Sequence, residues 1–483
     1  MDLQLALDRP RQRSLILAVA CVAFAAGAFV LQFVPFKLEM AISLVFLLVA
    51  VAWAARRNLD GSFDWFEIFL IFSALNFAYF GMGAIWFKAK PEELFSLSLR
   101  SYITPALVVG LVGFLSAAVG YATLGGSTPP SPVGRYVPSG SSFYIFVALV
   151  GSVGELGVVA QDRFVAAGTG FSPIASTVQQ FAPIFFYTWG LLWIQYWAKA
   201  LNRAQKLLLF FVVTPITGFV LVSLLGGKEL AILVLSYPAI AFWYARRKMP
   251  WAAFTAFALV GVFVVFPLYN TFRNQSRLLE TDVRMSRTLD LAMRWDRREF
   301  LDHSVNDFMK RMSLVYCVGA ILRDVPSAVP SRNGETLVLL PISLFVPRII
   351  WPDKPNITIG REFAVTFQLV NPVDQVTQIS PTITGELYWN YGVPGVVVGM
   401  FLLGAIFRVF YERYGSGTAR APLRTACYLA LLPMAMHFEG NVAAMMGGLA
   451  KSILILSLVF LVARWRGWIV EAAPPSPQGA RIP

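Results

Sequence analysis

Charged residues are scarce in this sequence. Asp, Glu, Lys and Arg make up 14% of the 483 residues, whereas soluble domains carry roughly 25%. Hydrophobic residues make up 57%, and they recur in runs close to the roughly 20 residues that one membrane crossing needs. This composition excludes a soluble globular protein and predicts an all-α polytopic integral membrane protein.

Cysteine and histidine are also rare. The three cysteines, Cys21, Cys317 and Cys427, fit no CxxC or metal-ligand spacing, and an odd number cannot complete a disulfide framework. The sequence has no Walker loop, no HExxH and no GxSxG motif, and its longest loop has no DxD cluster for a metal-bound nucleotide sugar. The common sites of soluble enzymes are therefore excluded, and no metal or other cofactor is expected.

The apolar runs predict about 12 transmembrane helices. The first, Leu15 to Val34, follows three arginines and lacks the cleavage site of a signal peptide, so the N-terminus is expected in the cytoplasm. The others are expected at 38–55, 66–87, 102–124, 142–160, 179–200, 207–225, 230–245, 251–270, 392–411, 424–444 and 447–463. An even number of crossings returns the C-terminus to the cytoplasm.

This topology divides the chain into four parts: residues 1–270 with helices 1–9, a large external loop at 271–391, helices 10–12 at 392–463, and a disordered cytoplasmic tail at 464–483. The cytoplasmic segments carry 19 Lys and Arg residues and the short external ones 7, as the positive-inside rule requires. The net charge of +13 is therefore interpreted as a sign of topology and not of nucleic acid binding. The remaining 14 basic residues lie in the large loop and need another explanation.

Part of that loop is predicted to be an arginine-bearing helix, because no Gly or Pro occurs between Leu268 and Val318. At roughly 100° per residue, six arginines share an arc of about 100°: Arg273, Arg277, Arg284, Arg287, Arg294 and Arg298. Guanidinium groups bind phosphate oxygens bidentately, which favours a pyrophosphate or polyanion along this face. The alternative is a solvated face neutralised by neighbouring carboxylates, or one attracted to lipid headgroups.

A second part of the loop is predicted to be re-entrant. Residues 335–355 (ETLVLLPISLFVPRIIWPDKP) are apolar but interrupted by prolines, and non-helical backbone at membrane depth survives only in a cavity lined by protein or water. Arg348 and Lys354 are expected at the mouth of this segment, where they would bind an anion. The alternative is that both side chains extend to lipid headgroups.

The segment PTITGELYWNYGVPG leads from the loop into the next span. Glu386 is a candidate general base or an arginine ligand, because a carboxylate at that depth is costly without a partner. The aromatic residues Tyr388, Trp389 and Tyr391 suit either an interfacial belt or stacking on sugar rings. The less specific interpretation is that an arginine pairs with Glu386 and holds the loop.

Five further residues are candidates for chemistry. His437 and Glu439, in PMAMHFEGN near the outer end of a span, are candidate proton acceptors, whereas His303 is the weaker histidine candidate. Lys228 follows two glycines in a short outer turn, which could present backbone N–H groups and an ammonium to phosphate or simply be a tight connector. Glu155 lies inside a span, where a carboxylate is a functional candidate by default.

The order PRIIWPDKP, then PTITGELYWNYGVPG, then a glycine-bearing span ending in arginine resembles the Wzy-type O-antigen polymerases, also called oligosaccharide repeat unit polymerases. The resemblance covers about residues 330–415, with the upstream helices and the large loop similar in outline. It implies a metal-independent GT-C-like membrane glycosyltransferase of the bacterial inner membrane, active on the periplasmic side. Its substrates would be undecaprenyl-pyrophosphate-linked repeat units, polymerised into O-antigen or exopolysaccharide.

The resemblance also implies partners and roles. Membrane lipids and a chain-length regulator (co-polymerase) are the candidate partners besides the lipid-linked glycans. Catalysis would fall to Glu386, His437 or Glu439, and the pyrophosphate would be bound by Arg273, Arg277, Arg284, Arg348, Lys354 and Lys228. Two alternatives stay open: an O-antigen ligase of related architecture, and a flippase or transporter for lipid-linked oligosaccharide.

Overall fold

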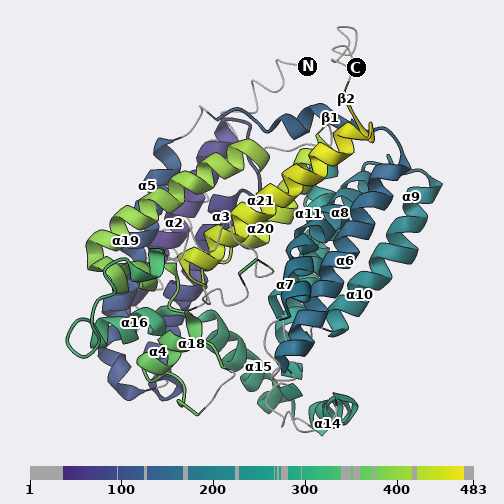
Figure 1. The fold of residues 1–483 in the computed structure, drawn as a ribbon. Helices are drawn as coiled ribbons and strands as arrows, with labels where there is room; N and C mark the ends of the chain where they lie inside the picture. The colour runs from purple at the N-terminus through teal and green to yellow at the C-terminus, as the bar shows by residue number, and fades with distance from the viewer. Residues whose placement is uncertain are drawn as a thin grey trace.

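The structure is a computed structural model of the chain. It describes residues 36–94, 96–124, 128–166, 172–223, 228–265, 267–268, 271–272, 281–294, 296–338, 350–351, 359–373, 377–415 and 421–472. The predicted first span (Leu15 to Val34) lies outside these residues. The described part is mostly helical, which confirms the all-α expectation apart from one two-stranded sheet (Figure 1).

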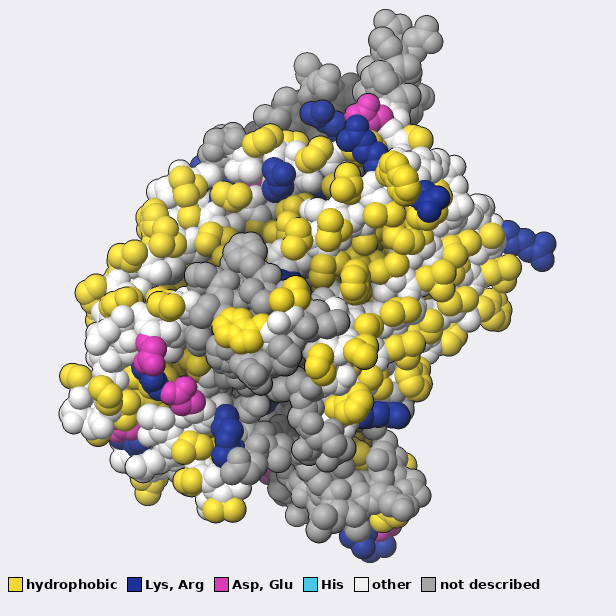
Figure 2. Space-filling view, in the orientation of Figure 1, with side chains coloured by type: hydrophobic (Ala, Val, Ile, Leu, Met, Phe, Trp, Pro, Cys, Tyr) yellow, Lys and Arg dark blue, Asp and Glu magenta, His cyan; other side chains and the backbone are white. Residues whose placement is uncertain are grey.

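Six helices among the described residues are long and apolar enough to cross a membrane: Lys37–Leu59, Ile68–Ala89, Leu97–Thr123, Ser141–Gln161, Ile383–Gly415 and Val442–Trp465. Their outer faces carry many exposed large apolar side chains, such as Leu149 at 62% and Leu458 at 52% exposure. Exposed apolar surface of this extent is unusual in a soluble protein. Figure 2 shows hydrophobic side chains over the helical surface and most charged side chains near its two ends. The chain is therefore a helical membrane protein.

The helices form two groups with a pair between them (Figure 1). The first group contains α2 (Lys37–Leu59), α3 (Ile68–Asn76), α4 (Gly83–Ala89), α5 (Ile103–Thr123) and α19 (Ile383–Phe410). The second contains α6 (Ser141–Ala166), α7 (Pro173–Val178), α8 (Ala182–Trp197), α9 (Arg203–Leu207), α10 (Thr214–Ser223), α11 (Lys228–Arg246) and α12 (Trp251–Val260). Between them lie α20 (Pro422–Ala435), which packs against α8, and α21 (Val442–Trp465).

Short helical turns extend several of these helices. The π-helical turns are η1 (Phe77–Met82), η6 (Leu208–Val213), η7 (Gly261–Val265) and η8 (Tyr411–Gly415). The 3₁₀ turns are η2 (Pro91–Glu93), η3 (Leu97–Tyr102), η4 (Pro132–Arg135) and η5 (Gln179–Phe181). η1 joins α3 to α4, so that these three elements form one long span, Ile68–Ala89. η8 continues α19 in the same way, which gives the span Ile383–Gly415.

The two ends of the bundle differ (Figure 1). One end, which we call the loop end, carries α14 (Thr281–Arg294), α15 (Arg297–Met312), α16 (Val315–Asp324) and α18 (Gly360–Thr366). The other, which we call the strand end, carries β1 (Tyr136–Pro138) and β2 (Ile469–Glu471). These strands pair antiparallel with Val137 opposite Val470. The expectation that the whole of residues 464–483 is a disordered tail is therefore wrong for residues 464–471, since α21 runs to Trp465 and β2 follows.

The last two spans also differ from their predicted bounds of 424–444 and 447–463. α20 ends at Ala435 and α21 begins at Val442, so six residues form a turn between them. This turn packs on the start of α19, where the backbone N–H of Ile383 donates to the carbonyl of Phe438 at 3.1 Å. Hydropathy alone could not find the turn, because the residues on either side of it are equally apolar.

The closest helix pair is α5 and α19, and glycines allow the approach. A Cβ added at Gly404 would lie 1.9 Å from the carbonyl oxygen of Ala117, and one added at Gly120 would lie 2.0 Å from that of Phe401. Small residues at such crossings are the usual means of close packing between membrane helices. The crossing fixes the membrane-spanning part of α19 against α5.

We expect Gly404→Ala to lower the free energy of unfolding by about 1–3 kcal/mol, because the new methyl group forces the two backbones apart. This loss would outweigh the gain of up to about 1 kcal/mol from replacing a helical glycine. Gly218→Ala in α10 is the matched control, since nothing lies within 4 Å of its added Cβ. Thermal unfolding in detergent should separate the two variants, and equal stability would contradict the close-packing argument.

Candidate functional site

Glu386 lies in the first turn of α19 and is fully buried. Its Oε2 accepts a hydrogen bond of 2.6 Å from the backbone N–H of Val442, the first residue of α21, where the helix dipole favours a negative charge. The hydroxyl of Thr336 is also close to this carboxylate. Its Oε1 has no hydrogen-bond partner among the described residues. None of the arginines in the described ranges forms an ion pair with Glu386.

Asn390, one turn after Glu386, fastens the preceding loop to α19. Its Nδ2 donates to the Glu386 carbonyl and to Thr336 Oγ1, both at 2.8 Å, and its Oδ1 accepts from the N–H of Gly334 at 2.8 Å. Gly334 has φ +91°, and an added Cβ would collide with the Tyr391 hydroxyl. Sequence reasoning missed Asn390 and Thr336, although an amide four residues after Glu386 shares its helix face.

α19 is not continuous. Tyr391 (φ −138°, ψ 16°) and Gly392 (φ +63°, ψ −150°) have non-helical backbone, and Pro394 follows. Residues 383–390 therefore form a short helical segment ahead of the membrane-spanning segment. The span predicted at 392–411 starts at this break, and Glu386 lies in the short segment before it.

The predicted glycan-binding aromatic residues have different surroundings. Trp389 is 1% exposed; its ring lies against Phe363 and Phe367, with the guanidinium carbon of Arg332 4.7 Å from the ring centre. The ring of Trp389 is thus enclosed by protein side chains, with no face open to a sugar. Tyr391 is 52% exposed and Tyr388 is half-buried, so both stay candidates.

His437 and Glu439 lie in the turn between α20 and α21. Because Phe438 accepts the hydrogen bond from Ile383, this turn is beside the first turn of α19. Glu439 Oε1 is 3.8 Å from a guanidinium nitrogen of Arg311 near the end of α15. The three predicted catalytic residues are thus brought to adjoining turns at one end of α19, and α15 of the large loop reaches the same place.

The helix predicted to carry the six arginines is not continuous, because α14 ends at Arg294 and α15 begins at Arg297. Arg294 pairs with Asp290 at 2.9 Å on an exposed surface, as the solvated-face interpretation expects. Arg284 lies in α14, and Lys228 is the first residue of α11. The other predicted pyrophosphate ligands lie outside the described residues: Arg273, Arg277, Arg348 and Lys354.

Several cations at the loop end already have partners. Lys310 of α15 pairs with Glu93, and the ammonium of Lys90 donates to Asn306 Oδ1 at 2.9 Å. These contacts fasten α15 to the end of α4. Within the described ranges, no group of three or more His, Cys, Asp or Glu side chains could hold a metal ion.

The strand end contains a buried cluster that sequence reasoning missed. Glu67 Oε1 accepts from Trp53 Nε1 at 3.0 Å and from the Tyr121 hydroxyl at 2.8 Å, and Oε2 pairs with Arg57 Nε at 2.9 Å. Burial raises the pKa of Glu67, while Arg57 and these donors oppose the rise. The cluster links α2, α3 and α5.

Asp64 extends this cluster toward α11 and α19. Its Oδ1 accepts from Trp243 Nε1 at 2.9 Å, and its Oδ2 accepts from the hydroxyls of Tyr244 at 2.9 Å and Tyr411 at 3.1 Å. Burial raises the pKa of Asp64, against the lowering effect of the N–H of Phe66 and of these hydrogen bonds. Both carboxylate oxygens of Asp64 thus accept hydrogen bonds from the chain itself, which is the arrangement of a structural carboxylate.

Comparison with known proteins gives one family. A family model described as a domain of unknown function, DUF8712, matches residues 170–414, just over half of the chain. The chain belongs to the DUF8712 family. The matched region runs from before α7 into η8 and so includes Glu386 and Asn390, but it ends before His437 and Glu439. No solved structure matches the chain.

Proposed function

We propose that this protein is a membrane glycosyltransferase that polymerises undecaprenyl-pyrophosphate-linked oligosaccharide repeat units into O-antigen or exopolysaccharide. The proposal includes about 12 transmembrane helices with GT-C-like architecture, and a location in the bacterial inner membrane. Both termini would be cytoplasmic, and the loop end would face the periplasm. Its supports are the resemblance at residues 330–415 and the helical membrane fold.

The placement of basic residues supports this orientation. Arg57 pairs with Glu67, Arg247 lies over the ring of Trp243, and Arg464 lies over that of Tyr136, all at the strand end. These arginines belong to the segments that the positive-inside rule assigns to the cytoplasm. The loop end, with α14 and α15, is then on the opposite side of the membrane.

The observation that carries the proposal is the state of Glu386. Buried polar atoms nearly always have hydrogen-bond partners, yet Oε1 of this carboxylate has none among the described residues. Oε2 is held by Val442 while Oε1 is left for another donor. We propose that this donor is the acceptor hydroxyl of a repeat unit.

In the proposed reaction, the hydroxyl oxygen at the non-reducing end of one lipid-linked unit attacks the anomeric carbon of the growing glycan on a second carrier. The new C–O glycosidic bond forms as the bond from the anomeric carbon to the pyrophosphate breaks. The hydroxyl proton passes to Glu386, and the undecaprenyl pyrophosphate leaves with the bonding electron pair. Cations at the loop end would stabilise the charge that develops on the leaving group.

We expect Arg273→Ala, Arg277→Ala and Arg348→Ala each to abolish long glycan chains while single-repeat glycan still reaches the cell surface. The physical reason is that removing one preorganised donor to a developing anion typically costs about 10²–10³-fold in rate. Gel electrophoresis of surface glycan measures the chain lengths. The control is Arg294→Ala, whose guanidinium is exposed and paired with Asp290.

Wild-type chain lengths in all three variants would refute the assignment of these arginines to the pyrophosphate. Loss of even single-repeat surface glycan, with normal insertion of the protein, would indicate a flippase instead.

The direct test is to incubate the purified protein with lipid-linked repeat units, without added metal or nucleotide. A ladder of products with increasing repeat number is the expected result. Transfer of glycan only to added lipid A core would indicate a ligase, and no transfer to either acceptor would overturn the enzymatic proposal.

A further inference from the structure

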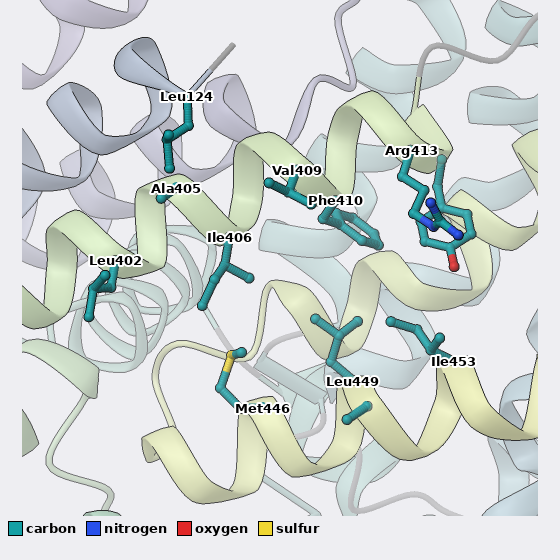
Figure 3. Close-up of a pocket in the computed structure, with 12 residues that line it drawn as sticks. Leu124, Leu402, Ala405, Ile406, Val409, Phe410, Arg413, Met446, Leu449 and Ile453 are labelled. Atoms are coloured by element: carbon teal, nitrogen blue, oxygen red, sulfur yellow. The ribbon is translucent and has the colours of Figure 1, made fainter. Parts of the chain in front are cut away.

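An apolar groove of about 450 Å³ lies between α19 and α21 (Figure 3). Its lining side chains come mainly from these two helices and point toward one another across the gap. The lining is apolar, with Leu402 and Ile406 on α19 opposite Met446 and Leu449 on α21, except for Arg413 and Tyr414 at one end. The groove faces the outside of the bundle, since Leu402 in its lining is 54% exposed and the neighbouring Leu454 is 55% exposed.

The groove has the length of one bilayer leaflet. From Leu402 to Arg413 the helix rises about 16 Å, close to half of the roughly 30 Å hydrocarbon core. Its volume is in the range of sites that hold one small ligand, about 300–1,000 Å³. A single hydrocarbon chain, entering from the side of the bundle, fits both the length and the apolar lining.

The polar end of the groove is positively charged. Arg413 and Tyr414 belong to η8 at the strand end, and the backbone carbonyl of Arg413 accepts from the N–H of Ser131 at 2.9 Å, which fixes its position. The Arg413 side chain lies beside the Tyr414 hydroxyl. Among the described residues, no carboxylate lies within ion-pair distance of the Arg413 guanidinium, whereas the adjacent Glu412 is taken by Arg408 at 2.8 Å.

We propose that this groove binds an anionic phospholipid, with one acyl chain between α19 and α21 and the lipid phosphate on Arg413 and Tyr414. The inference does not rest on the proposed function. A guanidinium fork beside a tyrosine hydroxyl suits a phosphodiester, and basic positions between membrane helices attract anionic headgroups. The site lies at the strand end, opposite Glu386.

The test is to delipidate the full-length protein and titrate it with phosphatidylglycerol or phosphatidylcholine of identical acyl chains, with native mass spectrometry as the readout. Wild-type protein should prefer phosphatidylglycerol. Arg413→Gln should weaken phosphatidylglycerol binding about fivefold, because one cation near an anionic headgroup typically contributes that much to the affinity. It should leave phosphatidylcholine binding unchanged. Arg413→Lys should restore most of the preference.

Two further variants separate the groove from general surface charge. Ala450→Phe fills the groove from its exposed side and should weaken the binding of both lipids. Arg466→Gln removes an exposed cation of the strand end outside the groove and should change neither. Thermal unfolding without lipid checks that each variant is folded.

Equal phosphatidylglycerol affinity in wild type, Arg413→Gln and Ala450→Phe would overturn the proposal. Displacement of phosphatidylglycerol by a polyprenyl phosphate at equal concentration would also overturn it, because the groove would then belong to a different lipid. If the wild type is a dimer and Ala450→Phe is a monomer, the groove is instead a contact with a second copy of the chain.

Discussion

Glu386→Gln should lower the rate of glycan chain extension by about 10²–10⁴-fold, the usual contribution of a positioned general base. The amide has nearly the same shape as the carboxylate, and its oxygen can still accept from the N–H of Val442. The contact between α19 and the start of α21 is therefore kept while the proton acceptor is lost. Single-turnover extension of purified lipid-linked repeat units measures the effect.

The control for Glu386→Gln is Glu335→Gln, which makes the same chemical change in a side chain that is 68% exposed and paired with Arg332. It should extend chains at the wild-type rate. If Glu386→Gln is as active as the wild type, Glu386 is only a cap for α21. Glu439→Gln then becomes the decisive variant, since Glu439 lies in the adjoining turn beside Arg311.

Local sequence pattern was enough to predict where several of the helices lie. The span expected at 38–55 corresponds to α2 and that at 392–411 to the part of α19 after its break, because an apolar run and a flanking glycine or proline are local signals. The boundary near residue 392 was found because Gly392 and Pro394 interrupt the helical pattern in the sequence itself.

Features that depend on distant partners could not be predicted in this way. Tryptophan is a residue type that commonly stacks on sugars, which is why Trp389 was a candidate. Its ring is enclosed by Arg332, Phe363 and Phe367, which come close to it only in the folded chain. Likewise, β2 exists because residues 469–471 meet β1, more than 300 positions earlier. Glu386 was identified by its depth, but its contact with Val442 links positions 56 residues apart.

The cluster around Glu67 shows the same limit for charged residues. Asp64 lies in the short polar connection between the spans predicted at 38–55 and 66–87, and Glu67 lies at the start of the second span. Nothing in the local sequence identifies a partner for either carboxylate. The structure buries both, because Trp53, Tyr121, Trp243 and Tyr244 from three other helices surround them. The hydrogen bonds and the ion pair to these carboxylates link several helices. Removing one of the carboxylates should therefore lower the stability of the whole bundle.

Glu67→Ala should destabilise the protein by about 3–5 kcal/mol, because it leaves the guanidinium of Arg57 without its buried counter-ion. The Arg57 side chain is 16% exposed and that of Glu67 is fully buried, so water cannot replace the lost carboxylate. The indole of Trp53 and the hydroxyl of Tyr121 also lose their acceptor. Denaturant unfolding in detergent measures the loss.

The matched comparison for Glu67→Ala is Asp290→Ala, which breaks the exposed pair with Arg294 and should cost no more than about 1 kcal/mol. Glu67→Gln should fall between the two, because the amide keeps a hydrogen-bond acceptor for Trp53 or Tyr121 but removes the charge that Arg57 requires. A Glu67→Ala variant as stable as Asp290→Ala would mean that Arg57 finds another anion or reaches water. The strand end would then be held by Asp64 and its hydroxyl donors, and Asp64→Ala would show the large loss instead.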